Sequence, residues 1–239
     1  MQPTMNHQMM GYDRSSTMFS PDGRLLQVEY AKKAVRQGTA CIGVCCKDGV
    51  LLVADKRVIE KLVVPESIQK IFQVDNHIAA APTGYLMDGR VIVERAQLIA
   101  QQHRITYDSE IDVLSLVKEI ANLKQAYTQY GGARPFGVSI LVAGIDEESP
   151  QLFVTDVTGI YFRYKATAVG EFDVELKELL EAGYKEDMSL DDALNMVINA
   201  LKKVYAKDFD AGKIDCAFVH QRTGFSLLDK TFMKKFIRK

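Results

Sequence analysis

Thr39 is the residue whose type and position could do chemistry, because it follows Gly38 at the head of an apolar run, residues 40–46. A threonine becomes a nucleophile when a base, such as its own α-amine, takes the hydroxyl proton. An α-amine with a pKa of about 7.7–8.0 can do so near neutral pH, whereas an amide nitrogen cannot. Since 38 residues precede Thr39, two hypotheses are open: a nucleophile released by cleavage after Gly38, or a strand residue that never reacts.

The four cysteines, by contrast, do not predict a metal site. Cys41, Cys45 and Cys46 lie in one apolar run, Cys216 lies far along the chain, and no histidine cluster accompanies them. The adjacent pair Cys45-Cys46 does not have the spacing of metal ligands. We therefore expect small buried side chains in a reducing compartment, with no metal and no cofactor.

The composition is that of a globular protein, with 239 residues of which 47% are hydrophobic and 26% charged. A net charge of −1 gives no electrostatic reason to expect a nucleic-acid partner. No apolar stretch has membrane-spanning length, and the N-terminus lacks the apolar core of a signal peptide. We expect a cytoplasmic protein with no membrane partner, whose residues 1–11, rich in Met, Gln and Asn, are mobile.

The elements that would position Thr39 begin with a turn at residues 20–23 and a helix that Gly38 ends. Turn residues then separate paired strands. The expected order is strands, two helices, strands, two helices and a final pair of strands. The second of the last two helices has Ser189 as its N-cap, with Asp192 three residues later. The predicted strands are residues 39–46, 49–57, 70–75, 77–82, 136–146, 151–157, 160–169, 214–220 and 224–229.

Two helices are expected between the predicted strands 77–82 and 136–146. The first covers about residues 86–103, with Val91, Leu98 and Ile99 facing the core; the second runs from Asp112 to Gly131-Gly132. Hairpin connections make the sheets mainly antiparallel, and uninterrupted apolar runs such as residues 139–145 indicate strands covered on both faces. The fold class is therefore α+β, with stacked sheets between helical layers.

Four segments resemble the α subunits of the proteasome 20S core particle, most closely the archaeal type. They are YDRSSTMFSPDGRLLQVEYAKKAV (12–35), ADKR (54–57), IQKIFQVD (68–75) and YTQYGGARPFGVSILVAGID (127–146). The resemblance extends from Tyr12 to Asp229 and implies the N-terminal-nucleophile fold, a four-layer αββα sandwich. It implies a gate segment (1–11) and one domain (12–239), made of a turn and helix (12–37), the sandwich (38–229) and a basic tail (230–239).

The resemblance also implies a function. Such α subunits are non-catalytic and form seven-membered outer rings, which control access to a chamber of proteolytic β subunits in ATP-dependent degradation of unfolded or ubiquitin-like-tagged proteins. The implied partners are other α subunits, β subunits, and a regulatory ATPase or activator whose C-terminal tails insert between α subunits. These tails end in a hydrophobic residue, a tyrosine and one further residue.

Thr39 falls where β-type subunits carry their nucleophile, and Asp55 and Lys70 fall near the positions of the β-type acid and lysine. Two features nevertheless predict that Thr39 is inactive. The preceding helix has its own apolar face and stop, unlike a disposable propeptide, and residues 166–176 lack the Gly-Ser-Gly-Ser loop of β-type sites. The alternatives are a self-processing β-type threonine protease that uses Thr39, and a stand-alone assembly module.

The resemblance assigns three further sets of residues. The first is a gate cluster that holds the N-terminal segment in its open form, made of Tyr12, Asp13, Arg14, Pro21 and Tyr30. The second is the pore constriction, made of Tyr130, Gly131, Gly132 and Ala133. The third is the pocket for activator tails, made of Lys70, Gly84, Tyr85 and Leu86. Lys70 would pair with the tail carboxylate, and Tyr85 and Met87 stand where smaller or aliphatic residues are usual, so Tyr85 would narrow the pocket. Simpler interpretations also stand: packed tyrosines, a helix C-cap at the glycines, and a solvated lysine on a strand.

Overall fold

The computed structural model describes residues 11–57, 62–64, 67–147, 149–229, 232, 235 and 236. Residues 1–10 of the expected gate segment and most of the expected basic tail, residues 230–239, lie outside the described residues.

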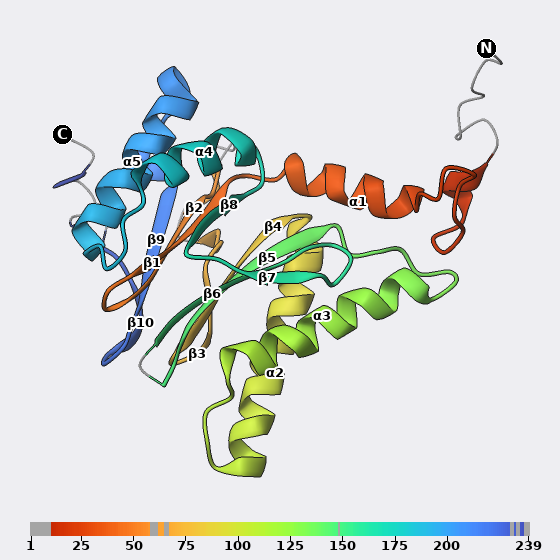
Figure 1. Ribbon diagram of the computed structural model, residues 1–239, viewed down its shortest axis with the longest axis horizontal. Coiled ribbons are helices and arrows are strands. Elements are labelled where there is room, and N and C mark those ends of the chain that lie inside the picture. Colours follow the sequence, from red (N-terminus) through yellow and green to blue (C-terminus); the bar gives the residue numbers. More distant parts are fainter. Residues whose placement is uncertain are drawn as a thin grey trace.

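The strands form two five-stranded sheets in which neighbouring strands are antiparallel, as the hairpin signals predicted (Figure 1). The first sheet has the order β10-β9-β2-β1-β8, and the second has the order β3-β4-β5-β6-β7. The strands are β1 Cys41–Cys46, β2 Gly49–Asp55, β3 Phe72–Asp75, β4 Ile78–Gly84, β5 Val138–Asp146, β6 Ser149–Thr155, β7 Tyr161–Arg163, β8 Ala166–Val169, β9 Ile214–His220 and β10 Gly224–Leu227.

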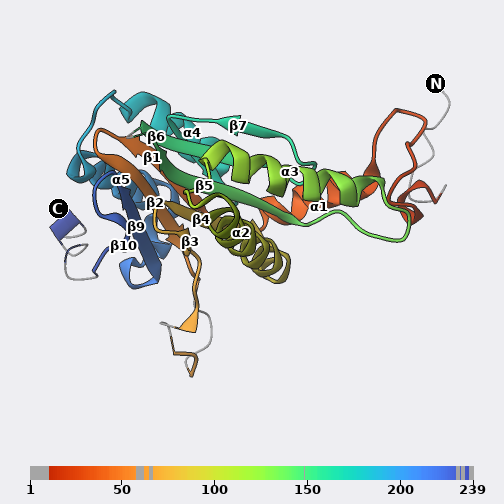
Figure 2. The ribbon, with the colours of Figure 1, turned by 90° about the horizontal axis from the view of Figure 1, so that it is seen from below.

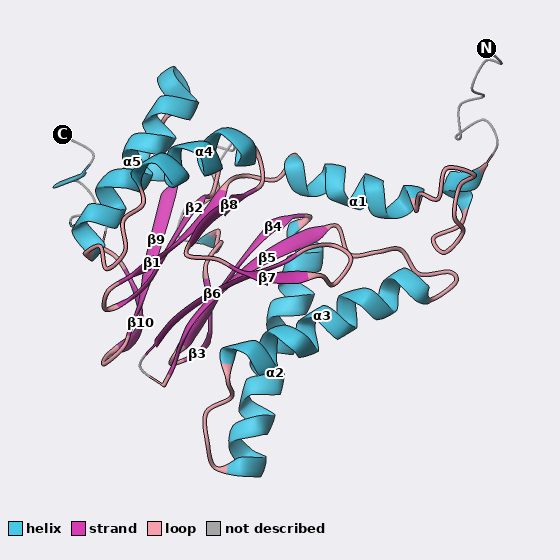
Figure 3. Cartoon of the chain, in the orientation of Figure 1, coloured by secondary structure: helices cyan, strands magenta, loops and turns pink. Residues whose placement is uncertain are grey.

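Two pairs of helices cover the outer faces of the sheets (Figure 3). The pair α4 (Asp173–Gly183) and α5 (Leu190–Tyr205) covers the first sheet, and the pair α2 (Leu86–Tyr107) and α3 (Val113–Gln129) covers the second. The fold is therefore a four-layer αββα sandwich, as expected. The remaining helix, α1 (Leu26–Arg36), lies outside these layers and leads directly into β1 (Figures 1 and 2).

The central strand β2 shows why its sequence is continuously apolar. Leu51 and Val53 pack under α4 and α5, whereas Val50, Leu52 and Ala54 point into the layer between the two sheets. All seven residues of the strand are buried. A strand covered on both faces has no solvent side, so its sequence lacks the alternation of a half-exposed strand.

Serine 189 caps α5 as predicted. Its hydroxyl oxygen accepts a hydrogen bond from the Asp192 backbone N–H at 3.2 Å, and the same hydroxyl donates to the Asp192 carboxylate at 2.7 Å. This satisfies one of the backbone donors that a helix start leaves without a partner. None of the helices in the described part of the chain combines the length and apolar character needed to cross a bilayer.

The predicted core face of α2 was wrong. Val91 and Leu98 are 47% and 51% exposed, while Ile99 is half-buried against the core beneath α2 and α3. The buried side is made instead of Ile92, Val93, Ala96 and Ala100. Apolar residues occur all around this helix, and two alanines allow close packing, so hydrophobicity alone did not identify the face.

The single strand predicted at residues 160–169 is also wrong, because the chain changes sheets within it. The Tyr164 backbone N–H bonds to the Leu152 carbonyl of the second sheet at 2.8 Å. The next residue, Lys165, accepts from the Cys45 N–H of the first sheet at 2.7 Å. β7 and β8 thus belong to different sheets, although extended backbone runs through both.

Candidate functional site

Thr39 lies between α1 and β1, and its hydroxyl is used to hold the backbone. Its Oγ1 donates to the Asp55 carbonyl oxygen at 2.7 Å, and the Thr39 carbonyl accepts from Thr83 Oγ1 at 3.3 Å. A hydroxyl that donates to a main-chain carbonyl is not being deprotonated by a base. These contacts fit a structural strand-opening residue.

The Gly38–Thr39 peptide is packed against two other glycines. A Cβ on Gly38 would lie 2.4 Å from the Gly84 nitrogen, and a Cβ on Gly170 would lie 2.7 Å from the Thr39 carbonyl oxygen. The Gly38 carbonyl also accepts from the Glu171 N–H at 2.8 Å. Three segments that are distant in sequence therefore meet here with their backbones in contact.

Asp55 and Lys70 are not arranged around the Thr39 hydroxyl as a catalytic set. The Asp55 carboxylate accepts from the Arg57 N–H at 2.9 Å and from the Tyr205 hydroxyl at 3.3 Å. Lys70 precedes β3 and is only 2% exposed. Across the described ranges, no hydrogen bond joins the Thr39 hydroxyl to the Asp55 carboxylate or to Lys70.

A polar cluster beside Asp55 was missed by the sequence reasoning. Tyr205 donates to Glu171 Oε1 at 2.8 Å, and Arg57 forms an ion pair with the same carboxylate. Burial, followed by the hydrogen bond to Glu171, raises the pKa of Tyr205 well above its usual value, so the phenol stays protonated. Tyr205 and Arg57 line a cavity of about 320 Å³. Glu171, in the loop between β8 and α4, is therefore already paired with Arg57 and Tyr205.

The cysteines behave as expected of inert buried residues. All four are free, and Cys41, Cys46 and Cys216 are buried. Burial raises the pKa of Cys45 to about 11 and that of Cys46 to about 12. The reactive form of a thiol is the thiolate, which these environments disfavour.

The proposed gate residues are partly brought together. Tyr30 donates to the Asp13 carboxylate at 3.5 Å, and the Asp13 carbonyl accepts from Gln27 Nε2 at 2.5 Å. Pro21 is exposed in the expected turn, which is closed by a Gly23 N–H bond to the Ser20 carbonyl at 2.8 Å. Tyr12 and Arg14 lie with Asp13 in a short 3-10 turn, Tyr12–Arg14. Gln27 is the contact that the sequence reasoning missed.

The proposed constriction turn follows α3 and touches the N-terminal segment. Tyr130 is 63% exposed, and its carbonyl accepts from the Ser16 hydroxyl at 3.4 Å. Figures 1 and 2 both show the loop after α3 next to the segment before α1. Gly132 has φ +85°, a conformation that favours glycine. The turn also ends the helix, because the Tyr130 N–H bonds to the Ala126 carbonyl at 3.2 Å.

The proposed tail pocket lies at one end of the β3–β4 hairpin. Phe72 pairs with Ala80, so Lys70 and Gly84 both lie at the end of the hairpin opposite its turn. Tyr85 and Leu86, at the start of α2, are 52% and 49% exposed. The interpretation of Lys70 as a solvated lysine on a strand is wrong, because the residue is buried and lies before β3.

An unexpected ion pair stands beside this pocket. Arg134 Nη1 and Nη2 donate to Asp88 Oδ2 and Oδ1 at 2.6 and 2.7 Å, and Asp88 Oδ2 also accepts from the Gly137 N–H at 2.9 Å. Burial favours the neutral Asp88 carboxyl, but the hydrogen bonds from Arg134 and Gly137 outweigh it and lower the pKa. Asp88 therefore stays ionised.

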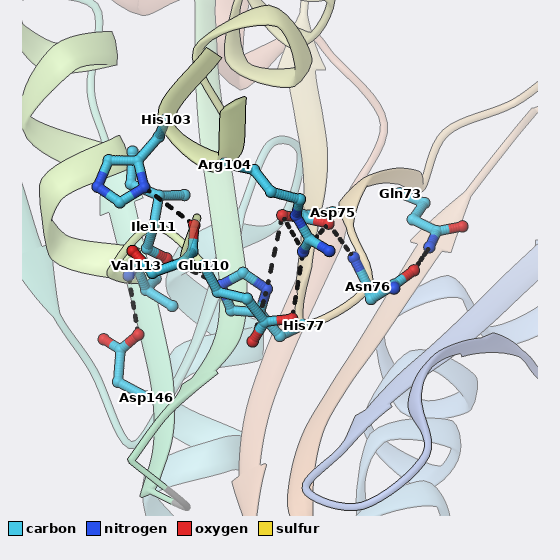
Figure 4. A network of polar contacts seen from close by, with 11 residues as sticks. Gln73, Asp75, Asn76, His77, His103, Arg104, Glu110, Ile111, Val113 and Asp146 are labelled. Atoms are coloured by element: carbon cyan, nitrogen blue, oxygen red, sulfur yellow. Dashed lines mark hydrogen bonds and ion pairs between the residues drawn. The ribbon is translucent and has the colours of Figure 1, made fainter. Parts of the chain in front are cut away.

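The other end of α2 carries a second polar network (Figure 4). Arg104 donates to both carboxylate oxygens of Asp75 at 2.9 Å and to Glu110 at 3.2 Å. His77 Nε2 donates to the Ile111 carbonyl oxygen at 2.8 Å, while the buried Nδ1 lies 3.8 Å from Asp75 and 3.6 Å from Glu110. Among the residues that the structure describes, no cluster of His, Cys, Asp and Glu is arranged to hold a metal ion. The network anchors the helix to the β3–β4 turn.

Comparison with known proteins covers nearly the whole chain. The family profile for proteasome subunits matches residues 35–219, and the profile for the N-terminal signature of A-type proteasome subunits matches residues 12–34. The proteasome alpha subunit of Methanocaldococcus jannaschii is 49% identical over 229 residues, which is 95% of this chain and 87% of the relative. The proteasome alpha subunit of Methanosarcina thermophila is 48% identical over 225 residues, covering 94% and 89% of the two chains.

Both profiles agree with the geometry, since the N-terminal signature spans the turn and most of α1, and the longer match spans the sandwich from β1 into β9. The chain therefore belongs to the proteasome subunit family and carries the N-terminal signature of its A-type, or α-type, subunits.

Proposed function

We propose that this chain is a non-catalytic subunit of the outer ring of a proteasome core, where it controls the access of substrates to β subunits. The observation that carries the proposal is the state of Thr39. Its hydroxyl donates to the Asp55 backbone carbonyl, and helix α1, which precedes it, is packed on the sandwich, so that a free α-amine is not expected. Without a free α-amine the threonine lacks its base.

The packing of α1 supports the view that it is retained. Val28, Ala31 and Val35 are buried with Val157, and Lys32 lies 3.6 Å from the Asp156 carboxylate. Burying a valine side chain is worth about 1.5–3 kcal/mol, so removing residues 1–38 would expose apolar surface at a substantial cost. A propeptide that is to be discarded would not need to make this contact.

The gating part of the proposal rests on contacts of the N-terminal segment. The Asp13–Tyr30 hydrogen bond holds the residues before α1 against that helix, and the Ser16–Tyr130 hydrogen bond holds them against the proposed constriction turn. In a ring of seven copies, residues 1–11 would then crowd a common axial opening. Tethering them aside through Tyr12, Asp13, Arg14, Pro21 and Tyr30 would open it.

The docking part rests on the end of the β3–β4 hairpin. An activator tail would place its carboxylate near Lys70 and its side chains against Tyr85 and Leu86. Because Lys70 is only 2% exposed, the carboxylate must approach the protein closely to reach it. Ion pairs in such a partly buried place are stronger than those on the surface.

The choice of test residue matters at this pocket. Gly84 has φ +118°, and a Cβ there would lie 2.2 Å from the Gly137 carbonyl oxygen. Gly84→Ala would thus strain the fold whatever the pocket does. Lys70→Ala removes the proposed charge partner instead, and it should weaken binding of an activator to the assembled particle.

The intact mass of the chain isolated from its native assembly tests the non-catalytic assignment. We expect a mass that includes α1, with Thr39 in peptide linkage. A mass that begins at Thr39 would free its amine, overturn the proposal and favour a self-processing β-type threonine protease.

A further inference from the structure

Arg134 stands between the proposed tail pocket and the proposed constriction turn. It follows Ala133, the last residue of that turn, directly in sequence. Its guanidinium binds Asp88, which lies in the first turn of α2, two residues after Leu86. Neither the sequence motifs nor the proposed function gives this pair a role.

The Asp88–Arg134 pair is geometrically restrictive. Two parallel N–H···O bonds of 2.6 and 2.7 Å fix the orientation of the guanidinium as well as its distance, which a single point charge would not do. Asp88 is 7% exposed and also accepts from the Gly137 N–H at 2.9 Å. The start of α2 and residues 134–137 are therefore held together as one unit.

Tyr85 connects this unit to the pocket. The Arg134 guanidinium lies 5.8 Å from the centre of the Tyr85 ring, and the Tyr85 N–H donates to the Gly137 carbonyl at 2.9 Å. A Cβ on Gly137 would lie 2.6 Å from Tyr85 Cδ2, so the ring packs directly on this backbone. Because Tyr85 is 52% exposed, it is accessible to a ligand, and moving its ring disturbs the contact with Arg134.

On its other side, Arg134 reaches the segment before α1. Arg134, Gly132 and Ala133 line a cavity of about 310 Å³ together with Arg14, Ser16 and Gln27. Ser16 bonds to the Tyr130 carbonyl, and Gln27 bonds to the Asp13 carbonyl. Arg134 thus contacts Tyr85 and Asp88, is joined by the chain to the proposed constriction turn, and shares a cavity with residues that precede or begin α1.

We propose that the Asp88–Arg134 pair is the positioning link through which a peptide tail seated on Tyr85 and Leu86 shifts the constriction turn, residues 130–133. This inference rests on the proposed gating function and adds the route by which docking is transmitted. Arg134 touches neither the tail nor the substrate in this scheme; it transmits the position of Tyr85 to residues 130–133.

The test uses particles assembled from full-length α and β chains, with Arg134→Lys as the variant. Lysine keeps the charge but loses the two-pronged geometry. The matched control is Arg104→Lys, which makes the same change in the ion pair at the opposite end of the same helix. The probe is a short synthetic peptide that ends in a hydrophobic residue, a tyrosine and one further residue, and both its binding and its stimulation of substrate hydrolysis are measured.

We expect Arg134→Lys to reduce peptide-stimulated hydrolysis about tenfold while the dissociation constant of the peptide stays within about twofold of wild type. Arg104→Lys should change neither. Asp88→Asn, which breaks the same pair from the other side, should reproduce the Arg134→Lys result, and both variants should still assemble. This separation of binding from stimulation is what a purely structural role would not produce.

Two results would overturn the link. Full stimulation in Arg134→Lys would show that the pair only stabilises the fold, and loss of peptide binding would show that it shapes the pocket. If wild-type particles bind no peptide, the docking function itself fails and the link falls with it. If wild-type particles bind the peptide, the results for the variants alone test the proposed link.

Discussion

Thr39 and Lys124 show that the chemistry of a side chain in this fold depends on its contacts rather than on its type. Thr39 has the hydroxyl of a nucleophile, but it donates that hydroxyl's proton to the Asp55 carbonyl. Lys124 is fully buried in α3 and donates to the Thr155 carbonyl and hydroxyl at 3.1 and 3.0 Å. The Thr39 hydroxyl holds the backbone together, and the Lys124 amine lies where burial disfavours its charged form.

Thr39→Ala should leave peptide hydrolysis by the assembled particle at its wild-type rate, because this hydroxyl has no base. The variant should lose about 1 kcal/mol of unfolding free energy, the typical net value of one hydrogen bond. Rates measured on reconstituted particles, together with urea unfolding of the chain, check both parts. Thr39→Ser retains a hydroxyl and should recover most of the stability. A large loss of hydrolysis in Thr39→Ala with assembly intact would contradict the non-catalytic assignment.

Because Lys124 is buried, we expect the unfolding free energy of the protein to depend on pH. Burial lowers the pKa of Lys124 to about 7, with the negative charge of Asp156 opposing the shift. Between that pKa and the unfolded value of about 10.4, the unfolded chain binds the proton more tightly, so the contribution of this group to stability rises with pH. Below the folded pKa both states are protonated and the burial penalty is constant.

Lys124→Met should remove this dependence. The unfolding free energy of wild type relative to the variant should rise by on the order of 2 kcal/mol from pH 7 to pH 9. Urea titrations of both proteins at the two pH values measure it. Parallel profiles for the two proteins would show that the folded pKa of Lys124 is not lowered.

At the scale of elements, local signals predicted the order of strands and helices, the antiparallel pairing and the Ser189 cap. The errors came where tertiary context decides. The apolar residues around α2 did not identify its buried face, and the strand-like sequence from Tyr161 to Val169 gave no sign of the change of sheet between Tyr164 and Lys165. Sequence patterns report the period of an element, not which sheet it joins.

For the candidate site, too, part could be predicted from the sequence and part could not. Its motif residues could be identified by resemblance, because they lie in short conspicuous segments. The Asp88–Arg134 and Glu171–Tyr205 contacts join residues 46 and 34 positions apart, respectively, and no local spacing marks such partners. Only the folded chain brings them together.

The cap of α5 gives a prediction at this scale. Ser189→Ala removes the acceptor for the Asp192 N–H and should reduce the unfolding free energy by about 1 kcal/mol. Ser189→Asp can accept the same bond and should stay close to wild type. Chemical unfolding of the three proteins checks the order, and equal stability of all three would show that the cap contributes nothing.

At the scale of the whole molecule, α1 and α3 both reach the end of the molecule where the N-terminal segment lies (Figure 1). If this end faces the axis of a ring, deletion of residues 1–11 should increase the hydrolysis of an unfolded protein several-fold. Hydrolysis of a short peptide, which needs a smaller opening, should change less. Comparing the two substrates on particles with and without the segment measures the effect, and equal rates for the unfolded protein would contradict a plug.

The strand order of the first sheet has a consequence for the timing of synthesis. The β1–β2 hairpin, residues 41–55, lies at the centre of that sheet, but its neighbours are β8, residues 166–169, and β9, residues 214–220. At a translation rate of about 5–20 residues per second, β9 emerges roughly ten to thirty seconds after β2. For that interval the edge of β2 that β9 will cover is unpaired, and unpaired strand edges pair readily with other chains. A newly made chain is therefore most exposed to edge-to-edge association before its C-terminal strands leave the ribosome.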